Sequence, residues 1–213
     1  MLKWFDENQR IFPWREDRAT KYQQIVSEIL LQRTKAETVA KYYDTFFSKF
    51  PDWNALANAS LEELEEIMKP LGLYRHRARR LYKLGEDIRR RGGKIPGNEN
   101  ELRDSGFIGL YVTNAFELFI LRNRKPLLDV NMSRLLKRYF KPGDFIDVRH
   151  DKEIQELAND IIEVRRCKEL NWAILDYAAL VCKTRNPLCG ECVLNKHCKY
   201  YELSQGDVTE EPE

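Results

Sequence analysis

Cysteine spacing constrains this chain more than any other feature of its 213-residue sequence. Four of the five cysteines lie in one short stretch, separated by six, two and five residues: Cys182, Cys189, Cys192 and Cys198. A disulfide framework is disfavoured, because the chain opens with no apolar signal segment and the residues before this stretch contain only Cys167. Four thiolates in one loop instead suit a metal centre.

The chemistry of this motif leaves two kinds of centre open. Tetrahedral zinc sites usually combine two separated C-x2-C pairs, and this chain has one such pair, Cys189 and Cys192. An iron–sulfur cluster also takes four cysteines, although the spacing differs from that of bacterial ferredoxins, which disfavours an electron carrier. The residues alone favour a cluster and keep zinc as the alternative. Cys167, outside the motif, is expected to be a buried apolar thiol.

Helical periodicity dominates the rest of the chain. Apolar residues recur at helical spacing in the segment 22–30, and again after Ser60, where Glu63 is placed for a capping box. No alternating run is bounded by a hairpin turn, so strands are not expected. Further helices are expected at 36–49, 75–90, 111–122, 131–140, 151–164 and 170–181. The sequence therefore predicts an all-α protein of about ten helices with short connections.

Composition and charge indicate the expected environment. Hydrophobic residues make up 43% and charged residues 33% of the chain, and no run reaches the roughly 18 apolar residues of a membrane helix. We therefore expect a cytoplasmic protein with no membrane association. The net charge is +2, but acidic residues after Tyr201 conceal a more basic body with runs at 75–80 and 89–91. Such runs are usually solvated helix faces, and nucleic-acid phosphate is the functional alternative.

The spacing of the four cysteines resembles the cluster loop of the helix-hairpin-helix DNA glycosylases, in the branch that includes endonuclease III and MutY. This resemblance implies a four-iron four-sulfur (4Fe-4S) cluster bound by the four cysteines of the motif. It also implies that the loop faces DNA, with basic residues between the first two ligands meeting phosphate. Lys183 and Arg185 occupy that interval.

The resemblance extends from about residue 12 to residue 201, nearly the whole chain. Its entry motif, Phe-Pro-Trp-Arg at 12–15, and the segment leading into the cysteines, at 171–177, both look like those of the family. The segment 27–34, Ser-Glu-Ile-Leu-Leu-Gln-Arg-Thr, is similar to the helix that brings a glutamate and a DNA-inserting glutamine to the lesion. The resemblance implies these roles for Glu28 and Gln32.

Two further segments carry roles that the resemblance implies. Leu-Gly-Leu-Tyr, ending at Tyr74, resembles the loop that wedges into the gap left by an extruded base, so Leu73 with Tyr74 in support is expected to fill that gap. The segment 128–134 matches the family's catalytic segment, which assigns Asp129 to stabilising the sugar cation and Glu28 to protonating the departing base. We expect these two carboxylates to face each other across a pocket that accepts a nucleobase.

The same resemblance implies a fold of two domains. Residues 21–128 are expected to form a six-helix barrel domain that contains the helix-hairpin-helix motif. Residues 1–20 and 129–203, from both ends of the chain, are expected to form the cluster domain, followed by a disordered acidic tail at 204–213. We expect a monomer, associated with the nucleoid, whose partner is double-stranded DNA carrying a mismatched or damaged base.

Each of these residues also has an ordinary structural interpretation. Glu28 lies off the apolar stripe of its segment and on its own would be a solvated helix glutamate. Asp129 precedes a helix and would by default cap it, a role compatible with catalysis because capping keeps a carboxylate rigid and ionised. Gln32 would be polar surface, and Tyr111 part of the core. The joint occurrence of the segments, in order and followed by the cysteines, favours the functional interpretation.

Tyr111 indicates which chemistry follows. Bifunctional relatives attack the sugar with a lysine just after the hairpin, and Tyr111 occupies that position here, as in thymine-mismatch glycosylases and some MutY proteins. The resemblance therefore implies a monofunctional glycosylase that leaves an abasic site. The hairpin departs from the family's Leu-Pro-Gly-Val-Gly, since residues 105–109 read Ser-Gly-Phe-Ile-Gly. Gly109 is kept for a phosphate contact, but Phe107 replaces a glycine, so backbone anchoring is expected to be weaker or rebuilt.

Three details favour thymine or uracil opposite guanine as the substrate. The wedge segment has the length seen in endonuclease III and the thymine-mismatch enzymes, Arg33 stands where MutY has glutamine, and the residues after Cys198 look closer to the thymine type. MutY enzymes also usually add a C-terminal domain, and this sequence ends soon after the cysteines.

Other substrates and another class of function stay open. The alternative substrates are adenine opposite guanine or 8-oxoguanine, and a modified base. The alternative from another class is a non-catalytic, cluster-bearing DNA-binding module. The degenerate hairpin favours that module, whereas the two retained carboxylates oppose it.

Overall fold

The computed structural model describes residues 1–98, 100–101, 109–143 and 147–206 of the chain. Every regular element in these ranges is helical, which confirms the all-α prediction. The α-helices are α1 (Leu2–Asn8), α2 (Lys21–Leu31), α3 (Ala36–Lys49), α4 (Trp53–Asn58), α5 (Leu61–Met68), α6 (Tyr74–Arg90), α8 (Leu110–Phe116), α9 (Val130–Phe140), α10 (Lys152–Ile161), α11 (Cys167–Leu180) and α12 (Lys199–Gly206).

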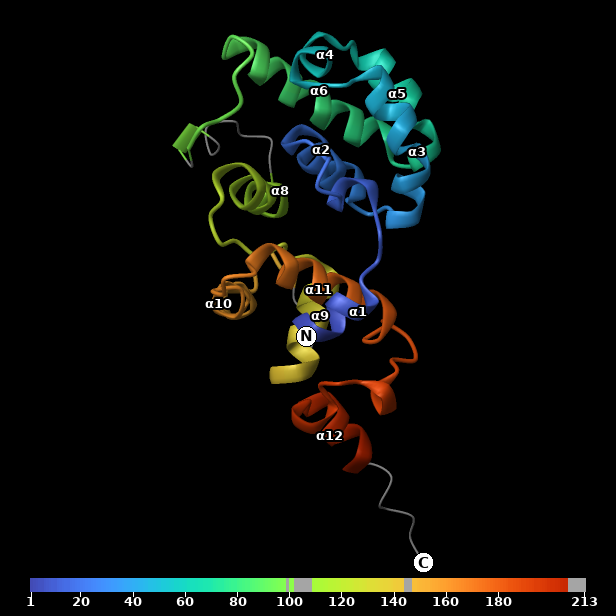
Figure 1. Cartoon of the computed structure of the whole chain (residues 1–213), viewed down its shortest axis with the longest axis vertical. Helices are drawn as coiled ribbons and strands as arrows, with labels where there is room; N and C mark the ends of the chain where they lie inside the picture. Colours follow the sequence, from blue (N-terminus) through green and yellow to red (C-terminus); the bar gives the residue numbers. More distant parts are fainter. Residues whose placement is uncertain (99, 102–108, 144–146, 207–213) are drawn as a thin grey trace, which may run out of the picture. The chain divides into compact units, whose positions relative to one another are not determined.

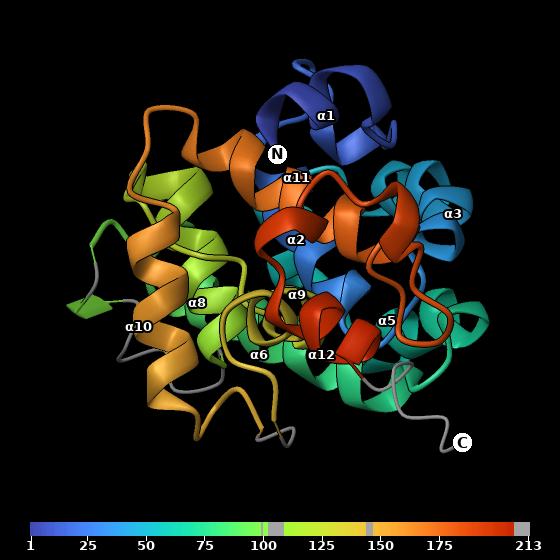
Figure 2. The same cartoon turned by 90° about the horizontal axis from the view of Figure 1, so that it is seen from below.

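The chain divides into two compact units (Figure 1, turned by 90° in Figure 2). The inserted unit comprises Ile11–Asn123 and contains α2 to α8. The terminal unit combines Met1–Arg10 with Arg124–Glu213 and contains α1 and α9 to α12. In Figure 1 the blue α1 lies beside the orange α11, so both ends of the chain build the terminal unit. The domain boundaries expected from the sequence, after residues 20 and 128, stay predictions.

α2 forms the centre of the inserted unit. It begins at a capping box, in which the Thr20 hydroxyl accepts from the backbone N–H of Gln23 (3.2 Å) and the Gln23 side chain accepts from the Thr20 N–H (2.9 Å). Residues 25–30 are all buried, since α2 contacts α3, α6 and α8. The expected apolar stripe is confirmed, but burial extends beyond it to Ser27 and Glu28.

α6 packs closely against α4 because residue 85 is a glycine. A Cβ atom at Gly85 would lie 2.7 Å from the carbonyl oxygen of Leu56 and 3.1 Å from the Cα atom of Ala57, so any side chain would push the helices apart. This contact fixes the position of α6. Leu73, in the expected wedge segment, directly precedes that helix as its N-cap.

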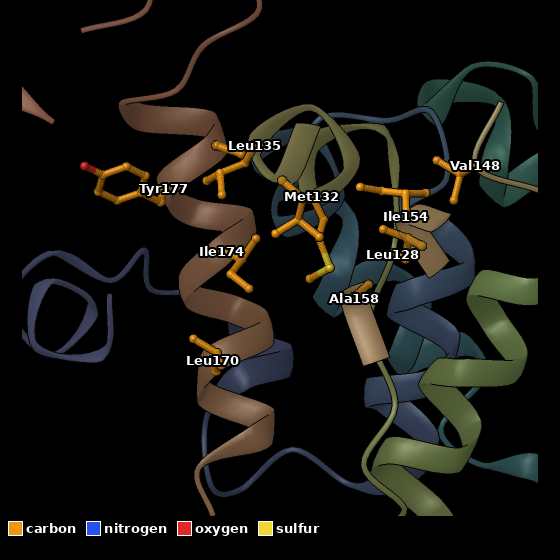
Figure 3. Close-up of a cluster of buried hydrophobic side chains, with 11 residues drawn as sticks. Leu128, Met132, Leu135, Val148, Ile154, Ala158, Leu170, Ile174 and Tyr177 are labelled. Atoms are coloured by element: carbon orange, nitrogen blue, oxygen red, sulfur yellow. The ribbon is translucent and has the colours of Figure 1, made fainter. Parts of the chain in front are cut away.

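Figure 3 shows the core of the terminal unit, where α9, α10 and α11 meet. Met132 of α9 lies between Ile174 of α11 on one side and Ile154 of α10 on the other. Burying each such side chain contributes about 1.5–3 kcal/mol. α1 joins this unit through Trp4, whose ring packs edge-on against Tyr177 with the centroids 4.7 Å apart. The core holds α9 in place, and Asp129 caps the first turn of that helix.

Most of the expected helices are confirmed, with ends shifted by a few residues. The segment expected as one helix at 111–122 is instead α8 followed by a π-helical segment, Glu117–Leu121. Apolar periodicity does not reveal the wider turn of a π-helix, which explains the error. α12 continues through residues 204–206, which were expected to begin the tail.

The structure also bears on a predicted helix cap and on Cys167. The Ser60–Glu63 capping box is present, and Cys167 is buried. Hairpin residues 105–108 and tail residues 207–213 lie outside the described part of the chain. Among the residues that the structure describes, no helix combines the length and apolar character needed to cross a bilayer.

Candidate functional site

Glu28 is a buried carboxyl group on α2, only 3% exposed. The Tyr111 hydroxyl, on α8, donates a hydrogen bond of 2.6 Å to Oε2 of Glu28. The solvated interpretation of Glu28 is therefore wrong. Tyr111 is half-buried and serves as a polar partner, not simply as core. This bond fixes one carboxyl oxygen of Glu28 relative to the Tyr111 ring.

Two strained turns belong to the segments that were expected to insert into DNA. Gln32 is the C-cap of α2, and the exposed Arg33 that follows has a left-handed φ of +58°. Leu73, before α6, has a φ of +46° and is 53% exposed, and Gly72 has a φ of +67°. Left-handed backbone at a non-glycine residue costs about 1–3 kcal/mol and persists only where its surroundings hold it. Such strain is common at functional sites.

One buried guanidinium holds both turns. Nη1 of Arg77, which is 4% exposed, donates to the carbonyl oxygens of Leu71 (2.7 Å) and Gly72 (2.6 Å). Nη2 donates to the carbonyl oxygen of Gln32 (2.5 Å) and to the hydroxyl of Thr34. Hydrogen bonds from a charged donor stabilise by about 1.5–3 kcal/mol each, so this set is large enough to offset the strain of both turns.

Arg77 was not predicted as a functional residue, because it lies in the basic run 75–80. In that run Arg77 is buried, while the neighbouring Arg79 and Arg80 are exposed. The signal that identifies it is its spacing, because it continues the buried apolar stripe of α6 formed by Leu81, Leu84 and Ile88. Arg80, one turn further along, donates to Oε1 of Gln32 and so holds that side chain.

Asp129 caps the N-terminus of α9, as expected. Its Oδ1 accepts the backbone N–H groups of Asn131 (2.8 Å) and Met132 (2.8 Å), and its Oδ2 accepts the side-chain amide of Asn131 (2.7 Å). Desolvation raises the pKa of Asp129 above its usual value, although these donors and Arg134 act in the opposite direction. Together the three hydrogen bonds hold the Asp129 carboxylate in one orientation.

A chain of hydrogen bonds connects Asp129 to the first cysteine of the motif. Asn131, which donates to Asp129, accepts at Oδ1 from Nη1 of Arg134 (3.0 Å). Nε of Arg134 donates to the carbonyl oxygen of Cys182 (3.0 Å), and Nη2 donates to that of Ala178 (2.8 Å). The amide partner of Asp129 is therefore held by the end of α11 and the residues that follow it.

Arg138 of α9 holds the loop between the first two cysteines. Its guanidinium donates to the carbonyl oxygens of Lys183 (2.6 Å) and Thr184 (3.1 Å). The side chains of Lys183 and Arg185 are exposed in this loop. The main chain of the loop is thus fixed by α9, while its basic side chains face solvent.

The four thiols of the motif lie close enough together for their charges to interact. Burial raises the pKa of the Cys189 thiol, and the charges of Cys182, Cys192 and Cys198 raise it further. The Tyr177 hydroxyl donates to Sγ of Cys192 at 3.2 Å. The motif therefore forms one group of thiols beside α11.

The four thiols are also the candidate metal ligands of this chain. In the described residues, which include all four cysteines, no three His, Cys, Asp or Glu side chains converge as one metal ion requires. A tetrahedral zinc ion, with Zn–S bonds of about 2.3 Å, would draw the sulfurs to within about 4 Å of one another. In a 4Fe-4S cluster each thiolate binds a different iron, so the sulfurs stand further apart. Four thiolates are a donor set that either centre takes, so the donor set alone leaves both open.

Gly109 and Tyr74 complete the set of expected residues. Gly109 is the N-cap of α8 with a φ of −74°, and a Cβ atom there would meet nothing within 4 Å. Neither its φ nor its described neighbours require a glycine at position 109. The absence of a side chain there leaves the backbone open to close approach by another molecule. Tyr74 opens α6, with the Arg75 guanidinium 5.6 Å from its ring centroid. The pocket expected between Glu28 and Asp129 stays a prediction.

Comparison with known proteins points to one family. The chain is 31% identical over 204 residues to the thymine/uracil-DNA glycosylase of Methanothermobacter thermautotrophicus, which covers 95% of this chain and 91% of that protein. It is 33% identical over 206 residues to the thymine-DNA glycosylase of Aeropyrum pernix, covering 94% and 92%. The solved structure of a thermostable thymine-DNA glycosylase matches with a TM-score of 0.85 at 31% identity, covering 95% and 93%. Residues 26–164 match the family model as well, and the chain belongs to the HhH-GPD superfamily of base excision DNA repair proteins.

Proposed function

We propose that this chain is a DNA N-glycosylase that removes thymine or uracil opposite guanine and leaves an intact abasic site. Relatives named thymine/uracil-DNA glycosylase and thymine-DNA glycosylase match more than nine-tenths of the chain. The observation that carries the chemistry is the hydrogen bond from Tyr111 to Glu28. It orients a buried carboxyl group and puts a hydroxyl where a bifunctional enzyme of this type would have an amine.

The proposed reaction divides the work between two carboxyl groups. Breaking the N-glycosidic bond sends its electron pair to the base and leaves positive charge on the deoxyribose. The Asp129 carboxylate stabilises that cation and takes a proton from the water that adds to C1′. Glu28 supplies a proton to the departing base, and exchange with solvent restores both groups.

The hydrogen bonds of Asp129 support this role. Donors from Asn131 and Met132 keep the carboxylate in one orientation, so little reorganisation is needed as the cation forms. Desolvation, which raises the pKa of Asp129, also strengthens the attraction between its carboxylate and a nearby positive charge.

Tyr111 supports a monofunctional reaction. A phenol hydroxyl cannot form a Schiff base with the opened sugar, whereas a lysine amine can. We therefore expect no covalent enzyme–DNA adduct when the reaction is run with borohydride. Trapping of such an adduct by the wild-type enzyme would contradict this part of the proposal.

Base extrusion is assigned to the two strained turns of the inserted unit. A base in duplex DNA is unreachable until it leaves the stack, which costs a few kcal/mol. Leu73, exposed and apolar, is proposed to fill the vacated space together with Gln32. A mismatched base costs less to extrude, which favours a mismatch over a normal pair.

We assign a 4Fe-4S cluster to Cys182, Cys189, Cys192 and Cys198, supported by the all-thiolate donor set and by the spacing of the cysteines, which resembles the cluster loop of the family. When bound, the cluster would hold this loop folded so that Lys183 and Arg185 meet phosphate. Anaerobically purified protein is expected to contain iron and sulfide and to absorb visible light. Stoichiometric zinc in their place would overturn the assignment.

A panel of duplexes tests the proposed activity. Identical DNAs carrying G·T, G·U, G·A and 8-oxoG·A pairs are incubated with the protein, and abasic sites are then cleaved with hot alkali. Cleavage at thymine and uracil opposite guanine is the expected result. Cleavage only at adenine would identify an adenine glycosylase, and tight binding with no cleavage of any duplex would identify a non-catalytic module.

A further inference from the structure

We propose that Arg77 is a positioning residue that couples the two strained turns, so that Gln32 and Leu73 act as one unit when a base is extruded. The inference deepens the proposed function and rests on it. Every residue that carries it belongs to the inserted unit.

The first observation is which carbonyl groups Arg77 binds. The carbonyl of Gln32 belongs to the peptide plane that joins it to Arg33, which has a φ of +58°. The carbonyl of Gly72 belongs to the plane that joins it to Leu73, which has a φ of +46°. Because a peptide group is planar, a hydrogen bond to its oxygen fixes the plane from which the next residue turns. Arg77 therefore fixes the backbone at both left-handed residues.

The second observation is the geometry of the donor. The guanidinium is rigid and planar, with Nη1 directed to Leu71 and Gly72 and Nη2 directed to Gln32 and Thr34. One rigid group thus spans the two turns, so a shift of either turn disturbs the other. A lysine has one nitrogen on a flexible stem and cannot reproduce this fork.

The third observation is the contrast between Arg77 and Arg80. Arg80 is exposed, and its guanidinium donates to the side-chain oxygen of Gln32. DNA or water can replace that bond without moving the backbone. Arg77 is buried and binds main-chain oxygens, so it keeps the turns in place whether or not Gln32 changes partner.

A purely structural arginine and a positioning arginine predict different results. If Arg77 only stabilised the fold, every folded variant would release the base normally, or its loss would combine independently with a loss at Leu73. If Arg77 acts by making the two turns one unit, its loss should add little once Leu73 has been removed, and it should matter most where extrusion is difficult. A double-mutant cycle separates the two cases.

The experiment compares the wild type with Arg77→Lys, Leu73→Ala and the double variant. Single-turnover release of thymine is measured from a G·T duplex and from the same duplex with thymine opposite an abasic site. Fluorescence of a 2-aminopurine beside the target reports extrusion. The cycle is repeated with Arg77→Met, which removes the positive charge completely. The control is Lys83→Met, which removes one positive charge from an exposed lysine of α6.

We expect Arg77→Lys to slow both extrusion and release from the G·T duplex about tenfold, as for the loss of one charged hydrogen bond of about 1.5 kcal/mol. The double variant should be about as slow as the slower single variant. For thymine opposite an abasic site, which is easier to extrude, the release rate of Arg77→Lys should fall by less than about threefold. Lys83→Met should behave as the wild type does.

Two results would overturn the inference while leaving the proposed function intact. In the first, the wild type is active, and the double variant's loss of rate equals the product of the losses from Arg77→Lys and Leu73→Ala. The other is an equal loss on the easily extruded substrate. A wild type that releases no base from any duplex would instead refute the proposed function itself. Melting temperatures of all variants show that each rate belongs to folded protein.

Discussion

The two units hold their carboxyl groups in different ways. Asp129 stands at a helix N-terminus, where backbone N–H groups have no partner within the helix, and two of them bind its side chain. Glu28 lies within α2, where the backbone N–H groups are already used, so its orienting hydrogen bond comes from Tyr111 on another helix. The position of Asp129 is thus fixed by backbone groups, whereas Glu28 is oriented by a side chain from another helix.

The two units also share one device. In each, arginine guanidinium groups on a helix bind main-chain oxygens of an exposed segment. Arg77 does so for the strained turns of the inserted unit, and Arg134 and Arg138 do so for residues 182–184 of the terminal unit. One rigid, planar guanidinium can thus hold several main-chain oxygens of a segment at once.

Asp129→Asn should have the largest effect, because it removes the charge while the asparagine oxygen can still accept the two backbone N–H groups of the cap. We expect thymine release from a G·T duplex to fall by at least about a hundredfold, with duplex binding close to normal. Single-turnover release and gel-shift titration measure the two quantities. A variant that releases thymine at the ordinary rate would remove Asp129 from the mechanism.

Tyr111→Phe should have a smaller effect, because it removes the bond to Glu28 without changing either carboxyl group. Loss of one hydrogen bond corresponds to about a fivefold slower release of the base. The same single-turnover assay applies, and DNA affinity serves as the control, since Tyr111 is not expected to contact phosphate. A fall in the release rate as large as that of Asp129→Asn would contradict a role for Tyr111 that is limited to orienting Glu28.

Lys183→Ala and Arg185→Ala should weaken binding and leave chemistry unchanged. Each removes one exposed positive charge from the loop between the first two cysteines. We expect the slope of log affinity against log salt concentration to fall by about one unit per variant, with bound enzyme releasing thymine at the normal rate. Lys152→Ala, an exposed lysine on α10, is the matched control. An unchanged salt slope would show that this loop does not face DNA.

The smallest expected effect is on stability. The folded protein raises the pKa of Asp129, so it binds that proton more tightly than the unfolded chain does. Stability contributed by this group is present at acid pH and lost as pH rises from the usual aspartate pKa through the raised one. The melting temperature of the wild type should therefore rise relative to that of Asp129→Asn as pH falls, because only the wild type takes up this proton. Thermal melts of both proteins across pH measure this, and a relative change in the opposite direction would contradict it.

The helices and their caps could be predicted from sequence because both depend on local patterns. Apolar spacing predicted α2 and α3, and Ser60 with Glu63 predicted the start of α5. Asp129 was correctly placed as a cap for the same reason. A helix was also predicted over 111–122, but the π-helical hydrogen bonding of Glu117–Leu121 was not, since it leaves no distinct local signal.

Burial of polar residues could not be predicted in the same way. Glu28 looked solvated because α2 shows one apolar stripe, but contacts with α3, α6 and α8 cover more of the helix than that stripe. Arg77 looked like part of a solvated basic run, although it continues the apolar stripe of α6. In both cases burial depends on tertiary packing, which local periodicity does not describe.

A double-mutant cycle of Glu28→Gln and Asp129→Asn tests most directly whether both carboxyl groups act on one extruded nucleotide. Single-turnover release of thymine from a G·T duplex is measured for the wild type, both single variants and the double variant. If the two groups act in one reaction, the double variant should be about as slow as the slower single variant. Losses that multiply, or ordinary release by either single variant, would contradict the shared mechanism.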